Sequence, residues 1–418
     1  MENNLLSAWS SVYGVVLAIL ILLAMITIHE FGHYIAGKLL KFKINEFSIG
    51  FGPALFKRKS KKTGELFAIR LIPLGGYCAF EDEDGLNEES DKAFSLAKGE
   101  TAAKKELNAA QESPFKKEEE SQTASVSDGA FTKKKPWQRI VVLFAGAFMN
   151  YLLALVLILV MIGSFGQSLV MVQGSEVADS QYIGYSFEEG DILLSAEGEG
   201  FYLTTDIAHA LNGKKAGTIV TFRVAREKEG GGYEEVEQEI MLRENVEIQN
   251  STQANRVFRA LGVGIRTETE IVDGEEVTNR YYMLTTTSYR FGFLETIGRS
   301  FVYSFKLAGS IFRVLGELLT GKLGLDALGG PVTTITMTSQ IAASGVRNFL
   351  EIAAYIGVNL AVFNLLPIPA LDGSKIVFTA IEWVRGKPIS RKVEAVIHAV
   401  GFVLLLGFAI LVDFLQFI

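Results

Sequence analysis

Long uncharged runs alternate along this chain with stretches that are rich in charge. Four of the runs reach the length of about 20 apolar residues that a helix needs to cross a bilayer core of about 30 Å. They predict transmembrane helices at 7–40, 137–165, 348–373 and 392–416. The first run does not match a removable signal peptide, because residues 1–12 lack a basic region. The pattern therefore indicates an α-helical integral membrane protein with four transmembrane helices.

The basic residues of the chain are concentrated in particular loops. Lysine and arginine are absent from residues 1–28, 140–213 and 395–418, whereas they cluster between the first and second helices and between the third and fourth. Loops that are rich in lysine and arginine stay in the cytosol. We therefore expect a multi-pass protein of the cell membrane with both termini extracytoplasmic.

The first cytosolic loop has two parts of different character. Residues 44–80 alternate apolar and polar side chains between glycine and proline breaks, which predicts a membrane-associated β-hairpin region. Residues 84–135 are rich in Glu, Lys, Ser and Ala and predict a flexible, charged insert. The loop thus combines an ordered β region with an insert to which we assign no catalytic role.

The region between the second and third helices is expected to be extracytoplasmic. Residues 170–245 predict a small α/β domain whose order of elements resembles a PDZ domain, a fold that captures peptides by strand addition. The elements expected there are a strand after Gly190, a helix at 204–211, and strands at 218–224 and 235–242. Residues 256–347 are expected to add further strands and an amphipathic helix.

That helix is predicted from Phe293 to Thr320. Arg299, Lys306 and Arg313 recur every seven residues, so their side chains share one stripe while aromatic and aliphatic groups occupy the rest. Such a pattern is typical of a helix that lies in the outer membrane interface. Its charges argue against a fifth transmembrane span.

Composition narrows the function classes. With 49% hydrophobic and 21% charged residues, the chain fits a membrane protein that also carries soluble parts. The net charge of −7 gives no sign of nucleic-acid binding. A single cysteine excludes an intrachain disulfide, so any exported part must fold without one.

A metal-binding motif stands at the end of the first apolar run. His29 and His33 are four residues apart, so on a helix both imidazoles can reach one metal ion, and imidazole is a preferred zinc ligand. Glu30 lies beside them, placed to take a proton from a zinc-bound water. The spacing therefore predicts one Zn²⁺ per chain and hydrolysis inside or at the edge of a bilayer.

A catalytic zinc needs a third protein ligand and one open position. The remaining histidines, His209 and His398, sit in plain helical or apolar contexts, and Cys78 is single. Asp372 is different, because it closes an uncharged stretch from Ile352 to Leu371, and an ionisable group at membrane depth is costly unless it has a function. The alternative for Asp372 is a helix end at the water interface.

These motifs together resemble the site-two protease family of intramembrane zinc metalloproteases, in its bacterial form with a single PDZ domain. The resemblance rests on His29-Glu30-x-x-His33 and on Asn364-x-x-Pro367-x-Pro369-x-Leu371-Asp372-Gly373. Further matching pieces are Gly50-Phe51-Gly52-Pro53, Pro73-Leu74-Gly75-Gly76-Tyr77, Gly146 with Asn150, and Gly330-Pro331-Val332.

The resemblance implies zinc ligands at His29, His33 and Asp372, with Glu30 as the general base. It also implies that Asn150, Asn364 and the backbone near Pro367 orient the substrate or the oxyanion. The β region at 44–80 would be a sheet beside the active site, whose edge can pair with an extended substrate.

The partners implied by the family are the lipid bilayer and single-pass membrane protein substrates, such as anti-sigma factors, or signal-peptide remnants. Two other classes stay open at this point. A non-catalytic scaffold with a PDZ-like module would lack a catalytic zinc, and a transporter built on broken helices would show internal repeats, of which we see no convincing example.

Overall fold

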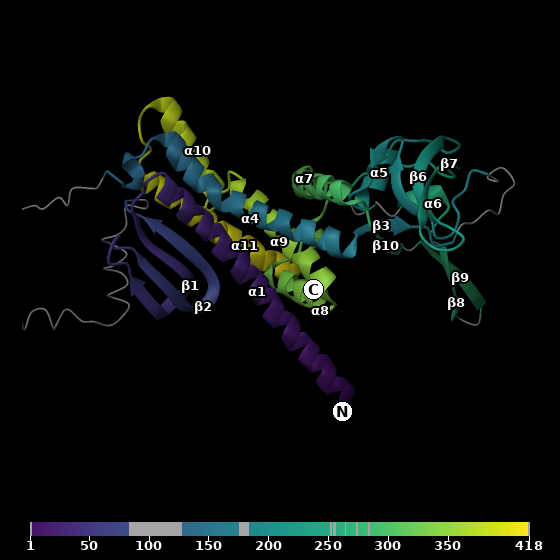
Figure 1. Cartoon of the computed structure of the whole chain (residues 1–418), viewed down its shortest axis with the longest axis horizontal. Coiled ribbons are helices and arrows are strands. Elements are labelled where there is room, and N and C mark those ends of the chain that lie inside the picture. Colours follow the sequence, from purple (N-terminus) through teal and green to yellow (C-terminus); the bar gives the residue numbers. More distant parts are fainter. Residues whose placement is uncertain are drawn as a thin grey trace, which may run out of the picture. The chain divides into compact units, whose positions relative to one another are not determined.

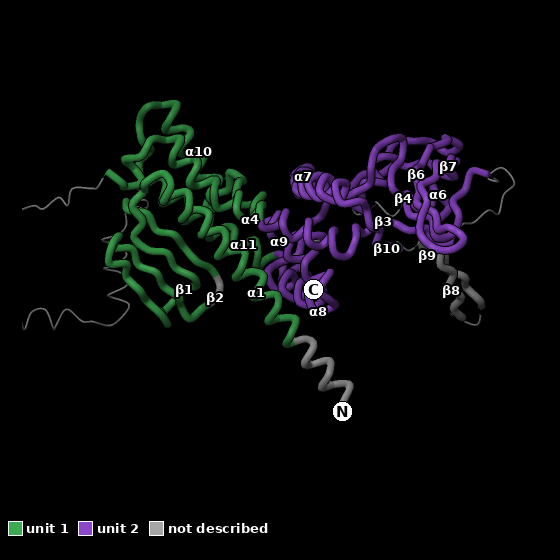
Figure 2. Tube along the Cα trace, in the orientation of Figure 1, with its two compact units in different colours: residues 1–152, 360–411 green, residues 153–359, 412–418 purple. Residues whose placement is uncertain are grey.

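The chain divides into two compact units (Figure 2), Met1–Leu152 with Leu360–Leu411 and Leu153–Asn359 with Val412–Ile418. The computed structural model describes residues 2–82, 128–174, 184–250, 253, 256–263, 265–272, 275–282 and 285–416. The predicted insert therefore lies, from residue 84 to residue 127, outside the described residues.

Helices account for most of the described chain (Figure 1). The helices are α1 (Glu2–Leu39), α4 (Pro136–Phe165), α5 (Thr205–Leu211), α6 (Arg256–Leu261), α7 (Phe293–Leu319), α8 (Pro331–Ala343), α9 (Val346–Leu365), α10 (Asp372–Arg385) and α11 (Arg391–Gln416), with 3₁₀ turns η2 (Phe131–Lys133) and η5 (Leu325–Ala327). The strands are β1 (Ile44–Lys59), β2 (Leu66–Phe80), β3 (Gln167–Met171), β4 (Ile192–Ala196), β5 (Glu199–Gly200), β6 (Ile219–Glu227), β7 (Tyr233–Met241), β8 (Ile265–Val272), β9 (Glu275–Tyr282) and β10 (Thr285–Tyr289).

Within the described residues, four helices are long and apolar enough to cross a membrane. They are Val12–Leu39, Pro136–Phe165, Val346–Leu365 and Lys392–Gln416, which confirms the predicted number of four spans. Their outer faces are apolar: on α11, Phe402, Val403 and Leu404 are each at least 60% exposed. Such a surface is stable only against lipid, so the chain is a multi-pass membrane protein.

The third predicted span was wrong at its end. We expected one helix to run from 348 to 373, but α9 ends at Leu365 and Asp372 begins a new helix, α10. Pro367 and Pro369 cause the break, since proline cannot donate a helical hydrogen bond and restricts the residue before it. The connection is tight, because a Cβ on Gly373 would lie 2.2 Å from the carbonyl oxygen of Leu366.

The two strands of the predicted β region are long and fold back on themselves. Residues 44–49 of β1 pair with 76–80 of β2 on one side and with 66–69 on the other, and 54–59 pair with 66–70. The result is a curled sheet in which 76–80 forms one edge. Gly50 and Gly52 allow the turn within β1, with φ of +84° and +82°.

One arginine holds this curled sheet together. The Arg70 guanidinium donates hydrogen bonds to Ser48 Oγ (2.9 Å), the Gly52 carbonyl (2.8 Å), Glu46 Oε1 (2.6 Å) and Tyr77 OH (2.8 Å). A guanidinium has five N–H groups in a fixed fork, so one side chain can link several segments. The edge segment is thereby fixed to the rest of the sheet.

The predicted end of the insert, at residue 135, is too late. Phe131 is only 4% exposed and its ring lies 5.5 Å from the ring of Phe42 and 5.7 Å from that of Phe80. The backbone of Lys43 also donates a hydrogen bond to the Gly129 carbonyl. A buried phenylalanine therefore anchors this end of the insert beside the β region.

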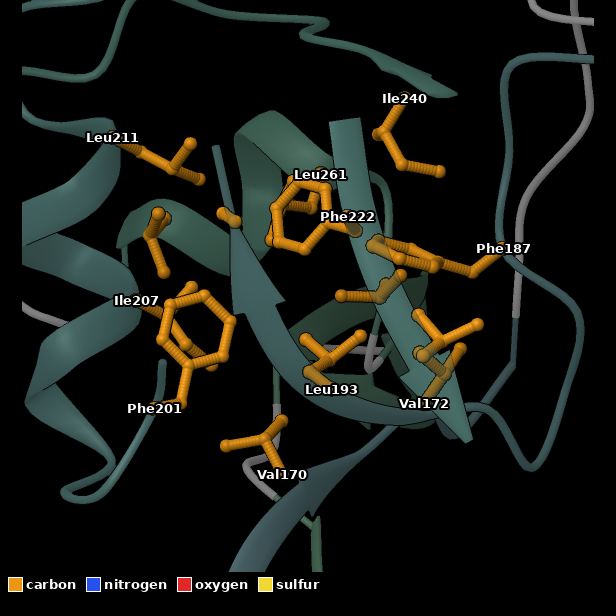
Figure 3. Close-up of a cluster of buried hydrophobic side chains, with 14 of the residues drawn as sticks. Val170, Val172, Phe187, Leu193, Phe201, Ile207, Leu211, Phe222, Ile240 and Leu261 are labelled. Atoms are coloured by element: carbon orange, nitrogen blue, oxygen red, sulfur yellow. The ribbon is translucent and has the colours of Figure 1, made fainter. Parts of the chain in front are cut away.

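In the second unit, the predicted strands and helix of residues 170–245 are present, and the sheet continues beyond them. Its order is β10–β3–β4–β6–β7, with β5 paired to β4, so residues 285–289 belong to it. Phe201, Phe222 and Leu193 are among the side chains that form its core (Figure 3). Helix α6 closes the same core, where we had expected only strands and turns.

Helix α7 matches its predicted bounds, but its charged stripe contacts protein. Arg299 is only 5% exposed, donates to Gln167 Oε1 at 2.6 Å and lies 3.9 Å from the ring of Phe291. Lys306 lies 3.0 Å from Asp206. Arg299 and Lys306 therefore attach α7 to the sheet domain, a contact that the pattern of an interfacial helix did not predict.

Candidate metal centre

The motif His29–His33 lies on the last turns of α1, which continues without a break to Leu39. His29 and His33 are 8% and 6% exposed, and their Nε2 atoms are 3.1 Å apart. Two imidazole nitrogens at this distance can share a hydrogen bond, and they are also at the spacing of two ligands of one cation. The helix alone brings these two nitrogens together.

Helix α4 packs closely on the motif because glycines stand at the crossing. A Cβ on Gly32 would lie 2.3 Å from the Ala145 carbonyl oxygen. A Cβ on Gly146 would lie 2.4 Å from His33 Nε2 and 2.8 Å from His29 Cε1. The backbone of α4 therefore forms one wall of the site, in a space that any side chain at 146 would fill.

Each imidazole is oriented by a partner on its far side. His33 Nδ1 lies 2.8 Å from the Val142 carbonyl, to which it donates its proton, so Nε2 keeps a free lone pair. The amide of Asn364 lies 3.4 Å from His29 Nδ1. The amide Nδ2 is the atom at this distance, so Asn364 contacts the ring on the side away from Nε2.

Asp372 completes a three-membered group from two distant parts of the chain. Its Oδ2 lies 2.9 Å from His29 Nε2 and 3.2 Å from His33 Nε2. Together with the 3.1 Å between the imidazoles, these distances form a nearly equilateral triangle. Ligands of a tetrahedral zinc at about 2.0–2.1 Å lie about 3.3 Å apart, so the donor set fits this ion and leaves a fourth position open.

Glu30 connects the metal centre to the curled sheet. Its carboxylate accepts a hydrogen bond from the backbone N–H of Cys78, in the edge segment of β2. Gly76 lets the strand pass close by, since a Cβ there would lie 3.3 Å from Glu30 Cγ. The expected base thus lies between the metal ligands and a sheet edge.

Asn150 is one turn after Gly146 on α4 and is fully buried. Neither atom of its amide has a hydrogen-bond partner in the part of the chain that the structure describes. A buried amide without a partner is costly, which marks a group that is kept for an interaction outside the chain's own packing.

The other candidates occupy different places. Pro367 is exposed in the connection between α9 and α10. His209 lies in α5 of the second unit and contacts Arg313. His398 contacts the backbone of Ala370, and Cys78 is buried in β2. The ligand group found among the described residues is therefore the predicted one, His29, His33 and Asp372.

Sequence reasoning missed the Val142 carbonyl as a partner of His33. No sequence signal could have found it, because a backbone carbonyl is present at every position. Asn364, which we expect to orient the substrate or the oxyanion, also contacts a ligand imidazole through its amide.

Four apolar helices with a His–His–Asp group beside a glutamate define a membrane-embedded zinc metalloprotease. The chain belongs to peptidase family M50, whose profile matches residues 17–408. It is 30% identical over 437 residues to the zinc metalloprotease RasP of Bacillus licheniformis, with 94% of this chain and 96% of that protein covered. It is 27% identical to the regulator of sigma-W protease RasP of Bacillus subtilis (94% and 95% covered) and 29% identical to RasP of Geobacillus kaustophilus (92% of each). Its cofactor is zinc, as in the relatives that are named zinc metalloproteases.

Proposed function

We propose that this protein is an intramembrane endopeptidase that cleaves the transmembrane segments of single-pass membrane proteins. The observation that carries the proposal is the triangle of His29 Nε2, His33 Nε2 and Asp372 Oδ2, with sides of 2.9–3.2 Å, beside Glu30 and next to the apolar helices α1, α4 and α9. A soluble protease has no need to surround such a centre with lipid-facing helices.

His29, His33 and Asp372 would hold the zinc, and Val142 and Asn364 would keep the two imidazoles in the required orientation. When bound, the zinc supplies a Lewis acid and lowers the pKa of a coordinated water from about 15.7 towards 7. The remaining steps of the reaction are carried out by side chains and backbone groups of the protein itself.

Glu30 accepts the proton of the attacking water and later delivers it to the leaving amine. The Cys78 N–H fixes its carboxylate at the edge of the curled sheet. An extended peptide that pairs with residues 76–80 would present its backbone to this carboxylate. A helical substrate hides its carbonyls in its own hydrogen bonds, so it must unwind before it can pair.

The buried side-chain amide of Asn150 can donate a hydrogen bond to the extended substrate or to the oxyanion that forms on it. We assign Asn364 to the orientation of His29 rather than to substrate contact. Pro367, together with Pro369, contributes by breaking the helix and so delivering Asp372.

The basic loops support an orientation in which both termini are extracytoplasmic and the sheet of β1 and β2 is cytosolic. In that orientation the metal centre lies towards the cytosolic side. The region between α4 and α9 would be extracytoplasmic, with a PDZ-like domain that acts as a lid or as a peptide module. The name of the Bacillus subtilis relative refers to sigma-W regulation, which favours anti-sigma factors as substrates over signal-peptide remnants.

The test compares wild type with Glu30→Gln in the purified, full-length protein. The variant should hold one zinc and lose cleavage of a single-pass anti-sigma factor from which the extracytoplasmic domain has been removed. In cells, mass spectrometry of the membrane fraction should show single-pass stubs that accumulate with the variant. If Glu30→Gln cleaves at the wild-type rate, Glu30 is not the general base. If the purified wild-type protein holds no zinc, the proposal of a zinc-dependent endopeptidase is wrong.

A further inference from the structure

The connection that delivers Asp372 contains a strained residue. Ala370, two positions before Asp372, has φ of +77°. A residue with a Cβ rarely adopts this left-handed conformation, so the surroundings must hold it. Glycine would adopt it freely, and the presence of alanine makes the external support necessary.

The support comes from α11, a helix that provides no metal ligand. His398 Nδ1 accepts a hydrogen bond from the backbone N–H of Ala370 at 3.0 Å. Because Nδ1 is the acceptor, the ring proton must be on Nε2, which lies 3.9 Å from Glu394 Oε1 one turn earlier on α11. The ring also packs edge-on against Phe378 of α10, at 5.7 Å. The imidazole is therefore held between the connection and the helix that Asp372 begins.

Gly401 gives the same connection a second contact one turn further along α11. A Cβ at this position would lie 2.2 Å from Pro369 Cβ, far inside the 3.5–4.0 Å at which carbon atoms pack. The residue before Ala370 thus rests directly on the helix backbone. Two positions on one face of α11 touch two consecutive residues of the connection.

We propose that His398 and Gly401 are positioning residues for the metal centre, and that α11 sets the place of Asp372 by clamping Pro369 and Ala370. The proposal rests on the proposed function in one respect, namely that Asp372 is a zinc ligand. An apolar side chain at 398 would release the Ala370 N–H and let the connection relax, which moves the carboxylate away from the two imidazoles.

The experiment measures metal binding rather than cleavage, with the full-length protein in detergent. His398→Leu removes the acceptor, whereas His398→Asn keeps a carboxamide oxygen near the position of Nδ1. Gly401→Ala pushes the connection away, whereas Gly407→Ala adds the same methyl to the same helix where no atom lies within 4 Å. Zinc affinity is measured by competition with a chelating dye, and the ligand geometry by the absorption spectrum of Co²⁺ in place of zinc.

His398→Leu and Gly401→Ala should each weaken zinc binding about 10-fold or more and change the cobalt spectrum, as expected when a group that orients a ligand is lost. His398→Asn and Gly407→Ala should keep the wild-type affinity and spectrum. If Leu and Asn at position 398 behave alike, or if Gly401→Ala matches Gly407→Ala, the clamp is wrong while the enzyme stands. A wild-type protein that binds no zinc would instead overturn the proposed function and this inference with it.

Discussion

Gly146→Ala should disrupt the metal centre although no metal ligand is replaced. The new methyl would lie 2.4 Å from His33 Nε2, and ordinary contact begins at 3.4 Å, so ring and methyl must separate by about 1 Å. The ring cannot swing aside cheaply, because its Nδ1 is bonded to the Val142 carbonyl at 2.8 Å. Zinc–ligand distances tolerate deviations of about 0.2 Å.

A displacement several times larger than this tolerance should weaken zinc binding about 100-fold or more, or about 2.7 kcal/mol. Zinc content after dialysis and a dye-competition titration measure the effect. Gly163→Ala is the matched control, since it lies on the same helix with no atom within 4 Å of the added carbon. Wild-type zinc affinity in Gly146→Ala would refute the derived geometry of the site.

Three further predictions concern the framework around the site, each measured by unfolding of the full chain in detergent. Arg299→Met should lower the unfolding free energy by about 1–3 kcal/mol, because buried acceptors lose their donor; an unchanged midpoint would show that α7 is not attached through this side chain. Asp191→Ala should cost about 3–5 kcal/mol, since its fully buried carboxylate pairs with Arg226 at 2.8 Å, and an effect below about 1 kcal/mol would contradict this reasoning. In a double-mutant cycle, Arg139→Ala and Glu382→Ala should show a coupling of about 0.5–3 kcal/mol, because the pair is 2.7 Å apart and mostly buried; purely additive effects would exclude the interaction.

The parts of the site that depend on one element could be read from the sequence. His29 and His33 share a helix face because four residues make about one turn. The apolar runs predicted the four long helices, since length and composition decide whether a helix can face lipid. The break after Leu365 was not part of the predicted span, although two prolines cause it.

Other features depended on contacts between elements, which no local pattern records. The charged stripe of α7 suggested a helix that lies in the outer membrane interface, yet Arg299 is buried against the sheet domain. Phe131 lies in a range whose composition predicted flexibility, but it packs against the rings of Phe42, just before β1, and Phe80, at the end of β2. In both cases packing against a distant segment overrode the composition of the local one.

The sequence by itself determined the chemistry of this protein: a zinc-binding helix with its base, embedded among apolar spans, and a carboxylate at the end of an uncharged stretch. Only the tertiary structure decided how these groups meet. Asp372 reaches His29 across 343 positions of the chain, Val142 sets the tautomer of His33, and His398 contacts the connection that carries the carboxylate. The reason is that residue types and helical periodicity act over a few residues, whereas ligand distances near 3 Å are set by how separate helices pack.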